Sequence, residues 1–484
     1  MHALSYSVRP PAVLKYFGQL CIILALLTLV PLVVSLMLGE YRSTLRYAIV
    51  AASLCVIWLF LRRLPSPRSI QTNEAMVVTA LAFLFTPLVM AWPLMFSGLT
   101  FGDALFEAIS GVTTTGLSVT ASVADKPAIF LFSRSWLQWT GGLGIVVLFL
   151  ATMVRPGLVA KRIGYSESYE EDIVGSARAT ARRIIAVYLA LTVFGIAVLG
   201  SLGAGWFNSV AYSFSAVSTG GFSPRNGSLA GLSLPLQAVV MLLCVAGAAP
   251  LILYFRSVKE HGWAFIRDHQ VPALLIAGLV ASLLTALFLF TQDAFSPLEA
   301  LHHGFLNAFS AQTGAGFSTL NISQISPGAK LTLIFFMFLG GCVGSTSGGI
   351  KILRLLILGK VLYVFLQRPA LPRQAVAHAS LGRRPLEADE IQGALSIVLV
   401  FLLSIGISWL VFVGLRYDPL DSLFEVVSAT GTVGLSSGIT GPELPSALKG
   451  ILSADMLLGR LEIIALLVLL YPGTWIGRRL EETR

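Results

Sequence analysis

Four short segments rich in threonine, glycine and serine recur in an otherwise apolar chain, and backbone of this composition can coordinate a cation. The segments are TTTGLS at 113–118, STGGFS at 218–223, TGAGFS at 313–318 and GTVGLS at 431–436. The four segments share a glycine, at Gly116, Gly221, Gly316 and Gly434. In each repeat one serine lies two residues after this glycine and another lies six residues before it. Intervals of 105, 95 and 118 residues separate these glycines. A repeat of this length in an apolar chain predicts four copies of one pore-forming unit.

The composition is that of a membrane protein that crosses the bilayer many times. Of the 484 residues 56% are hydrophobic and 12% are charged, and the mean hydropathy is +0.82, far from a soluble globular protein. Stretches long enough to cross a bilayer, about 20 residues each, occur at 14–38, 45–61, 75–97, 132–153, 183–202, 235–255, 271–291, 330–364, 391–415 and 448–471. We expect the first stretch to be retained, because it is too long for the apolar core of a signal peptide.

Basic residues indicate how these ten spans lie in the membrane. An even number of spans places both termini on one side, and with cytoplasmic termini the inner segments hold 22 lysines and arginines against 8 outside. This bias follows the positive-inside rule and predicts cytoplasmic N- and C-termini. The net charge of +9 is therefore an orientation signal, and we expect no nucleic acid partner. The four cysteines lie in apolar spans and predict no disulfide framework.

A segment too short to cross the membrane precedes each glycine-rich phrase. These segments start at Asp103, at Trp206, at Ser296-Pro297 and at Asp418-Pro419. Asp or Ser followed by Pro is a typical helix start, and each short helix would end at the Thr/Gly run. We therefore predict that each repeat consists of a span, a half-helix, a loop and a second span.

This order of elements favours a cation filter. A half-helix that enters from outside points the partial negative charge of its C-terminal end at the membrane interior. Glycine in the following loop permits positive φ, so that successive carbonyl groups can point the same way, and four such loops can replace the hydration shell of a cation. A single Gly/Ser/Thr cluster more often serves close helix packing. Four clusters in register, each after a half-helix, favour the filter.

These features resemble the membrane subunit of Trk-type potassium uptake systems, in the Trk/Ktr/HKT superfamily, over nearly the whole chain. GGCVGSTSGGIK at 340–351 and MLLGRLE at 456–462 are similar to that family's intramembrane loop and pore-lining arginine segment, and the hairpin 14–61 fits the Trk branch. The resemblance implies an all-α polytopic membrane protein with four pseudo-repeats around one central pore. It divides the chain into an N-terminal transmembrane hairpin and four pore repeats, at 1–68, 69–155, 156–260, 261–366 and 367–484, with a gating loop at 340–350.

The resemblance also implies which residues bind the ion. The potassium-binding filter would take three successive residues from each repeat, namely Thr114, Thr115 and Gly116; Thr219, Gly220 and Gly221; Gly314, Ala315 and Gly316; and Thr432, Val433 and Gly434. In related plant transporters, serine at the first of these glycines accompanies sodium permeation, and this chain has Gly116 there. We therefore expect potassium to be favoured over sodium, and no metal site outside the filter.

A second group of residues is implied to form the gate. The stretch 340–350 breaks the eighth span with small polar residues, for which a packing kink is the alternative. Arg460 lies in the last span, where an ionised side chain costs about 2.5–3.5 kcal/mol; by resemblance it is a barrier to cations, and an ion pair with Asp455 or Glu462 is the alternative. The implied gate residues are Gly340, Gly341, Gly344, Ser345, Thr346, Ser347, Gly348, Gly349, Lys351 and Arg460.

The expected function is potassium uptake across a bacterial inner membrane, gated by the loop and by a cytoplasmic partner. The resemblance implies a homodimer, surrounded by membrane lipid and docked to a Trk-type regulatory subunit that binds a nucleotide (NAD, ATP or ADP). No covalently bound cofactor is expected in this chain, and potassium is the transported ion.

Two other functions stay open. A proton- or sodium-coupled potassium symporter would need a titrating carboxylate in a span, and Asp455 and Glu462 are the candidates. A receptor or scaffold could keep a channel-like fold without conducting ions. An enzyme is not expected, because the sequence offers no HExxH motif and no nucleophile with its base. The adjacent His302 and His303 lack the acidic or cysteine neighbours of a metal site.

Overall fold

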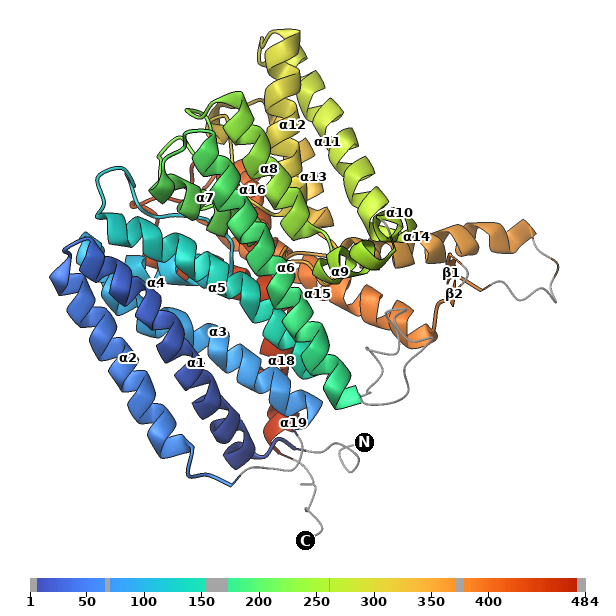
Figure 1. Cartoon of the computed structure of the whole chain (residues 1–484). Coiled ribbons are helices and arrows are strands. Elements are labelled where there is room, and N and C mark those ends of the chain that lie inside the picture. Colours follow the sequence, from blue (N-terminus) through green and yellow to red (C-terminus); the bar gives the residue numbers. More distant parts are fainter. Residues whose placement is uncertain are drawn as a thin grey trace.

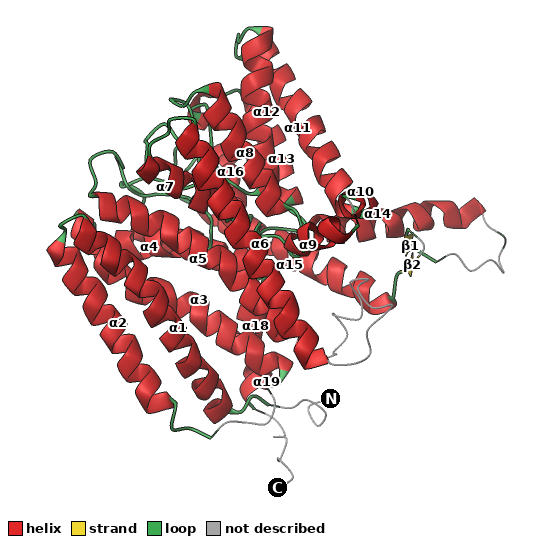
Figure 2. Ribbon diagram, in the orientation of Figure 1, coloured by secondary structure: helices red, strands yellow, loops and turns green. Residues whose placement is uncertain are grey.

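The computed structural model describes residues 7–65, 70–153, 173–260, 262–370, 372, 378–382 and 384–476. Its regular structure is almost entirely helical (Figures 1 and 2), as the sequence predicted for an all-α polytopic protein. One short antiparallel pair of strands, β1 (Ser380–Leu381) and β2 (Arg384–Pro385), lies within the range 367–484 that was predicted for the fourth repeat. The predicted boundaries at 68/69, 155/156 and 260/261 each touch residues outside the described ranges.

A helical hairpin precedes the four repeats. It consists of α1 (Pro10–Met37) and α2 (Tyr41–Leu61), joined by a turn in which Gly39 has a φ of 74°. The hairpin packs through α1 against α3 (Thr72–Leu94) and α5 (Ala128–Met153) (Figure 1). The hairpin is therefore an additional pair of helices packed against the first repeat.

Each repeat has the predicted order of span, half-helix, loop and second span (Figure 1). The first spans are α3, α6 (Ile173–Ser201), α11 (Gln270–Gln292) and α15 (Ala388–Gly414). The half-helices are α4 (Phe101–Val112), α7 (Trp206–Val217), α12 (Pro297–Thr313) and α16 (Pro419–Thr430). The second spans are α5, α8 (Leu234–Ala248) with α9 (Leu251–Lys259), α13 (Pro327–Leu339) with α14 (Ile352–Gln367), and α17 (Ser446–Arg460) with α18 (Ile464–Leu470). Short helices complete the set at α10 (Trp263–Arg267), α19 (Pro472–Trp475), η1 (Met95–Ser97), η2 (Ile322–Gln324) and η3 (Arg368–Ala370).

Side-chain caps explain where three of the half-helices begin. Ser296 and Glu299 form a reciprocal capping box at the start of α12, and the Asp418 carboxylate accepts from the N–H groups of the first turn of α16. The first half-helix starts two residues before the predicted Asp103, because Thr100 is the cap and its hydroxyl accepts from the Asp103 N–H at 3.2 Å.

Two spans that the sequence predicted as continuous are broken, and both predictions were wrong. The range 235–255 bends by 92° between α8 and α9, where Pro250 supplies no N–H to continue the helix. The range 448–471 breaks after α17, where Glu462 and Ile463 have φ of 50° and 66°. Among the described residues, six helices are long and apolar enough to cross a membrane continuously, namely α1, α2, α3, α6, α11 and α15, and the bent pair α8–α9 makes a seventh if counted as one span.

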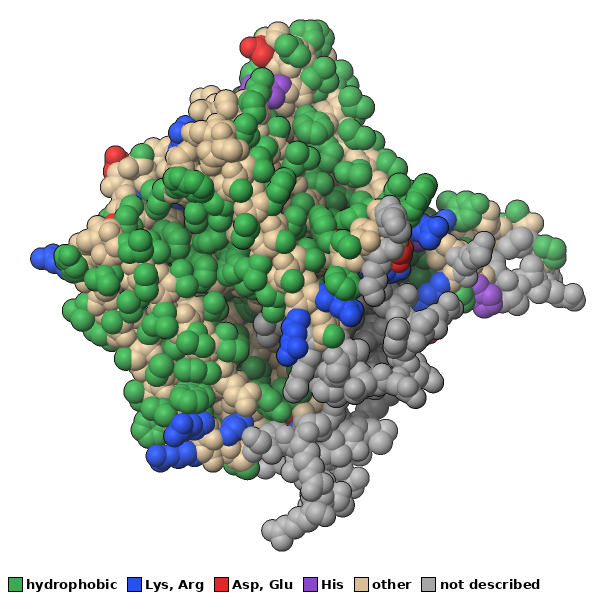
Figure 3. Space-filling model, viewed as in Figure 1, with side chains coloured by type: hydrophobic (Ala, Val, Ile, Leu, Met, Phe, Trp, Pro, Cys, Tyr) green, Lys and Arg blue, Asp and Glu red, His purple; other side chains and the backbone are tan. Residues whose placement is uncertain are grey.

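The two ends of the described chain lie on the same side of the molecule (Figure 1). The Val8 N–H donates to the Thr474 carbonyl at 2.8 Å, and Arg9 forms an ion pair with Glu74 at 2.7 Å. This agrees with the even number of spans in the predicted topology. Figure 3 shows hydrophobic side chains over much of one face; one group of lysines and arginines lies at its lower left, and others lie near its centre and at its right. Such a face suits lipid.

Candidate functional site

The four half-helices end in one shared hydrogen-bonding pattern. In each repeat the residue before the shared glycine donates its N–H to the carbonyl of the serine six places before that glycine. The distances are 2.9 Å for Thr115 to Ser110, 2.7 Å for Gly220 to Ser215, 2.9 Å for Ala315 to Ser310 and 2.8 Å for Val433 to Ser428. All four serines are fully buried. The bond turns the chain out of the helix and fixes the start of each loop.

The backbone then alternates between left-handed and ordinary conformations. The shared glycines have positive φ, as the sequence analysis expected, with values of 94°, 78°, 71° and 94° at Gly116, Gly221, Gly316 and Gly434. The residues two places earlier are also left-handed, with φ of 55°, 52°, 70° and 51° at Thr114, Thr219, Gly314 and Thr432. Three of these are threonines, for which this conformation is strained. That strain was not predicted from the sequence.

The twelve predicted filter residues come together as a closed ring, which we call the glycine ring (114–116, 219–221, 314–316 and 432–434). A Cβ atom added to each shared glycine would strike the carbonyl oxygen of the residue before the glycine in the next repeat. These clash distances are 2.2 Å from Gly116 to Gly220, 2.3 Å from Gly221 to Ala315, 2.0 Å from Gly316 to Val433 and 1.9 Å from Gly434 to Thr115. The fourth repeat thus returns to the first, and each position requires glycine.

The second spans support the ring through glycines that the sequence analysis missed. A Cβ on Gly141, Gly247 or Gly459 would lie 2.0, 2.4 or 1.8 Å from a carbonyl oxygen near the end of the half-helix in the same repeat. Each of these glycines follows the shared glycine of its repeat by 25 or 26 residues. That spacing was a detectable signal, because close helix approach favours small residues.

Buried side chains nine places before each shared glycine hold the loop on its outward path. These residues are Glu107, Tyr212, Asn307 and Glu425. In the first repeat, Glu107 accepts from the Ser118 hydroxyl at 2.6 Å and from the Val119 N–H at 2.9 Å. In the fourth repeat, Glu425 accepts from the Ser436 hydroxyl at 2.5 Å. The two carboxylates were not singled out from the sequence.

The predicted gate segment, 340–351, is irregular and largely buried. Gly340, Gly344 and Gly349 have positive φ. The segment bonds to the bend between α8 and α9, because the Cys342 N–H donates to the Ala248 carbonyl at 3.0 Å and the Thr346 N–H donates to that of Gly247 at 3.0 Å. The segment is therefore an ordered loop inserted between helices.

This loop lies against the glycine ring at the residues where three of the four loops enter it. The Thr346 and Thr219 hydroxyl oxygens are 3.3 Å apart. A Cβ on Gly348 would lie 1.9 Å from the Thr432 hydroxyl, and one on Gly314 would lie 2.9 Å from the Ser347 hydroxyl. Three of the four repeats thus contact the loop at the residue that enters the ring.

Arg460 fastens the loop to the first repeat. It ends α17 and is 1% exposed; its guanidinium donates to the Thr346 carbonyl at 2.6 Å and to the Gly141 carbonyl at 2.7 Å. The expected alternative, an ion pair with Asp455 or Glu462, is not formed within the described part of the chain. Asp455 accepts instead from Ser408 at 2.9 Å.

Two further basic residues near the loop lie at the start of α14, the helix that follows it. Lys351 is 2% exposed and donates to the Ser347 carbonyl. Arg354 on α14 pairs with Glu462, which lies at the break of the last span. The structure thus brings all ten predicted gate residues together, and it adds Arg354 and Glu462 as a link between the loop and that break.

Polar links at the outer rim join each of the last two repeats to the next. Lys330 pairs with Asp421 at 2.7 Å, and Lys449 pairs with Asp103 at 2.6 Å. Burial raises the pKa of the Asp103 carboxyl, but hydrogen bonds from Lys449 and Thr100 outweigh it and hold the pKa below its ordinary value. These pairs close the ring from the third repeat to the fourth and from the fourth to the first.

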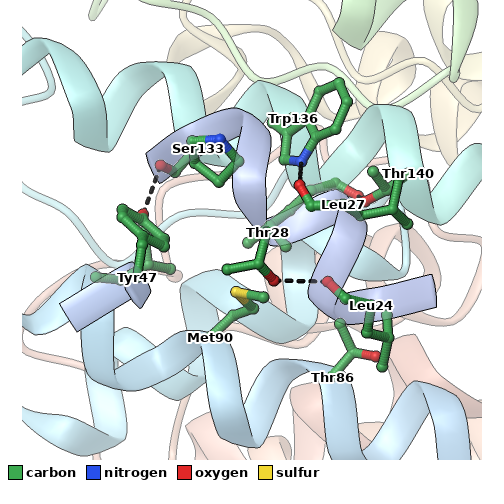
Figure 4. Close-up of a pocket in the computed structure, with 12 residues that line it drawn as sticks. Leu24, Leu27, Thr28, Tyr47, Thr86, Met90, Ser133, Trp136 and Thr140 are labelled. Carbon is green, nitrogen blue, oxygen red and sulfur yellow. Dashed lines mark hydrogen bonds between the residues drawn. The ribbon is translucent and has the colours of Figure 1, made fainter. Parts of the chain in front are cut away.

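Two other features contribute no binding site. The His302 ring forms a hydrogen bond with the Gln237 side chain at 2.8 Å, and the His303 ring forms one with the Thr319 hydroxyl at 2.9 Å. Among the described residues, both histidines therefore have structural hydrogen-bond partners. A cavity of about 20 Å³ lies between the N-terminal hairpin and α3 and α5, beside the hydrogen bond between the Tyr47 and Ser133 hydroxyl groups (Figure 4). It has room for about one water molecule.

The fold and the site define a polytopic membrane transport protein built from four repeats around one ring. The profile of the TrkH family, described as "Cation transport protein", matches residues 48–472. The chain belongs to this family of cation transporters, which is not a class of enzymes, and the predicted resemblance is confirmed.

Individual relatives agree over nearly the full length. The chain is 31% identical to an uncharacterized cation transporter of Methanocaldococcus jannaschii, over 94% of each chain. It is 30% identical to the Trk system potassium uptake protein TrkH of Halomonas elongata, over 96% of this chain and 98% of the relative. The crystal structure of the potassium transporter TrkH from Vibrio parahaemolyticus superposes with a TM-score of 0.85 at 24% identity, covering 97% of this chain and all of that one, and shows the same fold.

Proposed function

We propose that the protein takes up potassium ions across a bacterial inner membrane, with both termini in the cytoplasm. The closed glycine ring supports this most strongly, because the four loops present their carbonyl groups to one another at positions where only glycine fits. Such a ring can replace the water shell of a cation. Relatives named as potassium uptake proteins, such as that of Halomonas elongata, favour potassium.

We propose that the twelve ring residues bind potassium and favour it over sodium. A carbonyl ring selects ions by its size and by the strength of its field. Gly116 leaves no room for a side chain, and serine there would collide with the Gly220 carbonyl of the next repeat. The packed ring therefore keeps its geometry only with four glycines.

The loop 340–351 and Arg460 are proposed to be the gate in a closed arrangement. The loop covers the inner end of the ring, and the Arg460 guanidinium places a positive charge directly beneath it. A cation leaving the ring would meet this charge in a low-dielectric site. Opening would require the bond from Arg460 to the Thr346 carbonyl to break and the loop to move aside.

Opening is proposed to depend on a cytoplasmic Trk-type regulatory subunit that binds NAD, ATP or ADP, docked to a homodimer of this chain in the lipid membrane. No covalently bound cofactor is part of this proposal. The candidate docking surfaces, the inner segments 155–182 and 365–389, lie partly outside the described residues. Their described parts include the start of α6, the end of α14, η3, the β1–β2 hairpin and the start of α15.

The membrane potential can drive the uptake. One elementary charge gains about 2.3 kcal/mol per 100 mV, which corresponds to roughly fiftyfold accumulation. A second candidate function, proton-coupled symport, is favoured by Asp455, because this carboxyl group is 2% exposed and its Oδ2 atom has no hydrogen-bond partner among the described residues. A buried carboxyl group of this kind could carry a proton.

Rubidium uptake into proteoliposomes that hold the purified protein, at an imposed potential, tests the proposal. We expect flux that follows the voltage without a proton or sodium gradient, that rises with Arg460→Ala and that loses selectivity over sodium with Gly116→Ser. Flux that requires a proton gradient, and that loses this requirement with Asp455→Asn, would establish symport instead.

A further inference from the structure

A buried glutamine of the first repeat contacts the loop of the second. Gln138 lies on α5, which packs against α7, and it is fully buried. Its Oε1 atom accepts from the Phe222 N–H at 3.0 Å, and its Nε2 atom donates to the Gly220 carbonyl oxygen. One side chain therefore holds the second repeat at two backbone groups, one on each side of Gly221.

The sequence of the second repeat fits this contact. Gly220 is followed by the shared Gly221, whereas the other repeats have Thr115, Ala315 and Val433 at the place of Gly220. A Cβ on Gly220 would lie 2.4 Å from Cδ of Gln138. The additional glycine thus makes room for the amide group of Gln138.

The same amide lies where the first and second repeats meet. A Cβ on Gly116 would lie 2.2 Å from the Gly220 carbonyl oxygen and 3.6 Å from Nε2 of Gln138. Within the described residues, the equivalent carbonyl groups of Thr115, Ala315 and Val433 accept from no side chain. The ring is therefore asymmetric at one of its four carbonyl groups.

We propose that Gln138 is a residue that determines ion selectivity by positioning and partly occupying the Gly220 carbonyl group. This inference rests on the proposed function of the ring as a potassium filter. By holding both backbone groups, the amide prevents the second loop from moving inward around a smaller ion. Because the Gln138 amide donates a hydrogen bond to the Gly220 carbonyl oxygen, this oxygen offers a weaker electric field to a cation. Both effects disfavour sodium relative to potassium or rubidium, because size and field strength set selectivity.

Two substitutions separate this role from a general packing role. Gln138→Leu removes both hydrogen bonds at similar volume. Gln138→Met also removes both hydrogen bonds, at a side-chain length close to that of glutamine, and brings no charge into the buried site. The matched control is Gln237→Leu, which removes a buried amide of α8 that bonds to the carbonyls of Leu229 and Leu232 and to the His302 ring; none of these three partners is a residue of the glycine ring.

The experiment measures rubidium and sodium uptake into proteoliposomes that hold the full-length protein, at one imposed potential. We expect the rubidium-to-sodium ratio to fall about tenfold in both Gln138 variants, the factor that corresponds to one buried hydrogen bond. The ratio should stay unchanged in Gln237→Leu. A loss of total flux alone would not produce this pattern.

Each outcome decides between the two proposals. Unchanged ratios in both Gln138 variants, with selective rubidium flux in the wild type, would overturn the role of Gln138 and leave the filter standing. Wild-type protein that carries no rubidium would overturn the filter and this inference with it. As a second measurement, potassium should raise the melting temperature of the purified wild type more than sodium does; a difference of the same size in the Gln138 variants would also overturn the inference.

Discussion

The first and fourth repeats place a glutamate at the same point behind the glycine ring but compensate its charge differently. Glu107 pairs with Arg134 at 2.9 Å, and both side chains are at most 3% exposed. Glu425 is equally buried, and its described partners are hydroxyl groups and one N–H of the chain that leaves the ring, among them Thr440 at 2.7 Å. The shared task of the two glutamates is therefore to accept hydrogen bonds from the outgoing loop.

The ion pair adds a second task in the first repeat. The Arg134 guanidinium lies 3.8 Å from the centre of the Phe222 ring, which belongs to the second repeat. Arg134 thus connects the glutamate of one repeat to the loop of the next, at the junction where Gln138 also acts. The four repeats therefore share one backbone arrangement, whereas each junction between two repeats is stabilised by its own side chains.

The largest effect should come from Glu107→Gln. This change leaves the Arg134 guanidinium buried without a counter-charge, which costs about 3–5 kcal/mol. Thermal unfolding of the purified protein in detergent measures it. Glu425→Gln is the matched control, and equal losses in the two variants would contradict the difference between the repeats.

A smaller loss is expected when both members of the pair are replaced. Glu107→Gln combined with Arg134→Met removes both charges, so most of the loss should be recovered, leaving about 1–2 kcal/mol. The same unfolding measurement, read as a double-mutant cycle, tests this. Additive losses from the two single changes would show that the charges do not interact.

Glu425→Gln should cost about 1 kcal/mol or less. The amide oxygen keeps its acceptor role toward Ser436, and the amide group can donate to the Thr440 hydroxyl, so no buried charge is left without a partner. The measurement compares the thermal unfolding of Glu425→Gln with that of the wild type at high potassium concentration. A loss near that of Glu107→Gln would mean that Glu425 has a hidden cationic partner.

The smallest effect concerns the pair that joins the fourth repeat to the first at the outer rim. Asp103→Asn should cost about 0.2–1 kcal/mol, because Lys449 and Asp103 are partly exposed. Because the pKa of Asp103 is lowered on folding, its contribution is present above the unfolded value of about 3.9 and is lost as pH falls through the folded value. Melting temperatures of wild type and variant should therefore converge in strong acid. A difference that stays constant down to that range would contradict the ion pair.

Much of the architecture could be predicted from the sequence, because it is written in local patterns. The apolar stretches, the caps before α12 and α16, and the shared glycines depend on residues close together in the chain. The breaks at Pro250 and at Ile463 were missed. Proline alone does not reveal a 92° bend, and nothing local announces a left-handed isoleucine.

The side chains behind the ring could not be placed for a related reason. Arg134 pairs with Glu107 across 27 residues of chain within the first repeat, and Gln138 bonds to Gly220 across 82 residues, between the first repeat and the second. Both contacts form only when helices that are distant in the chain pack together. Arg460 was identified as a costly charge, but its acceptors are backbone carbonyls, which any residue could supply. The sequence therefore indicated that the Arg460 charge needs a hydrogen-bonding partner, but it did not indicate which groups would accept.

The most direct test of the central claim is the anomalous difference density of thallium(I), a potassium analogue, in crystals of the full-length protein. If the ring binds potassium, density is expected on the axis of the glycine ring, within coordination distance of the carbonyl oxygens of Thr115, Gly220, Ala315 and Val433. A ring without thallium density, in protein that still takes up rubidium, would contradict it.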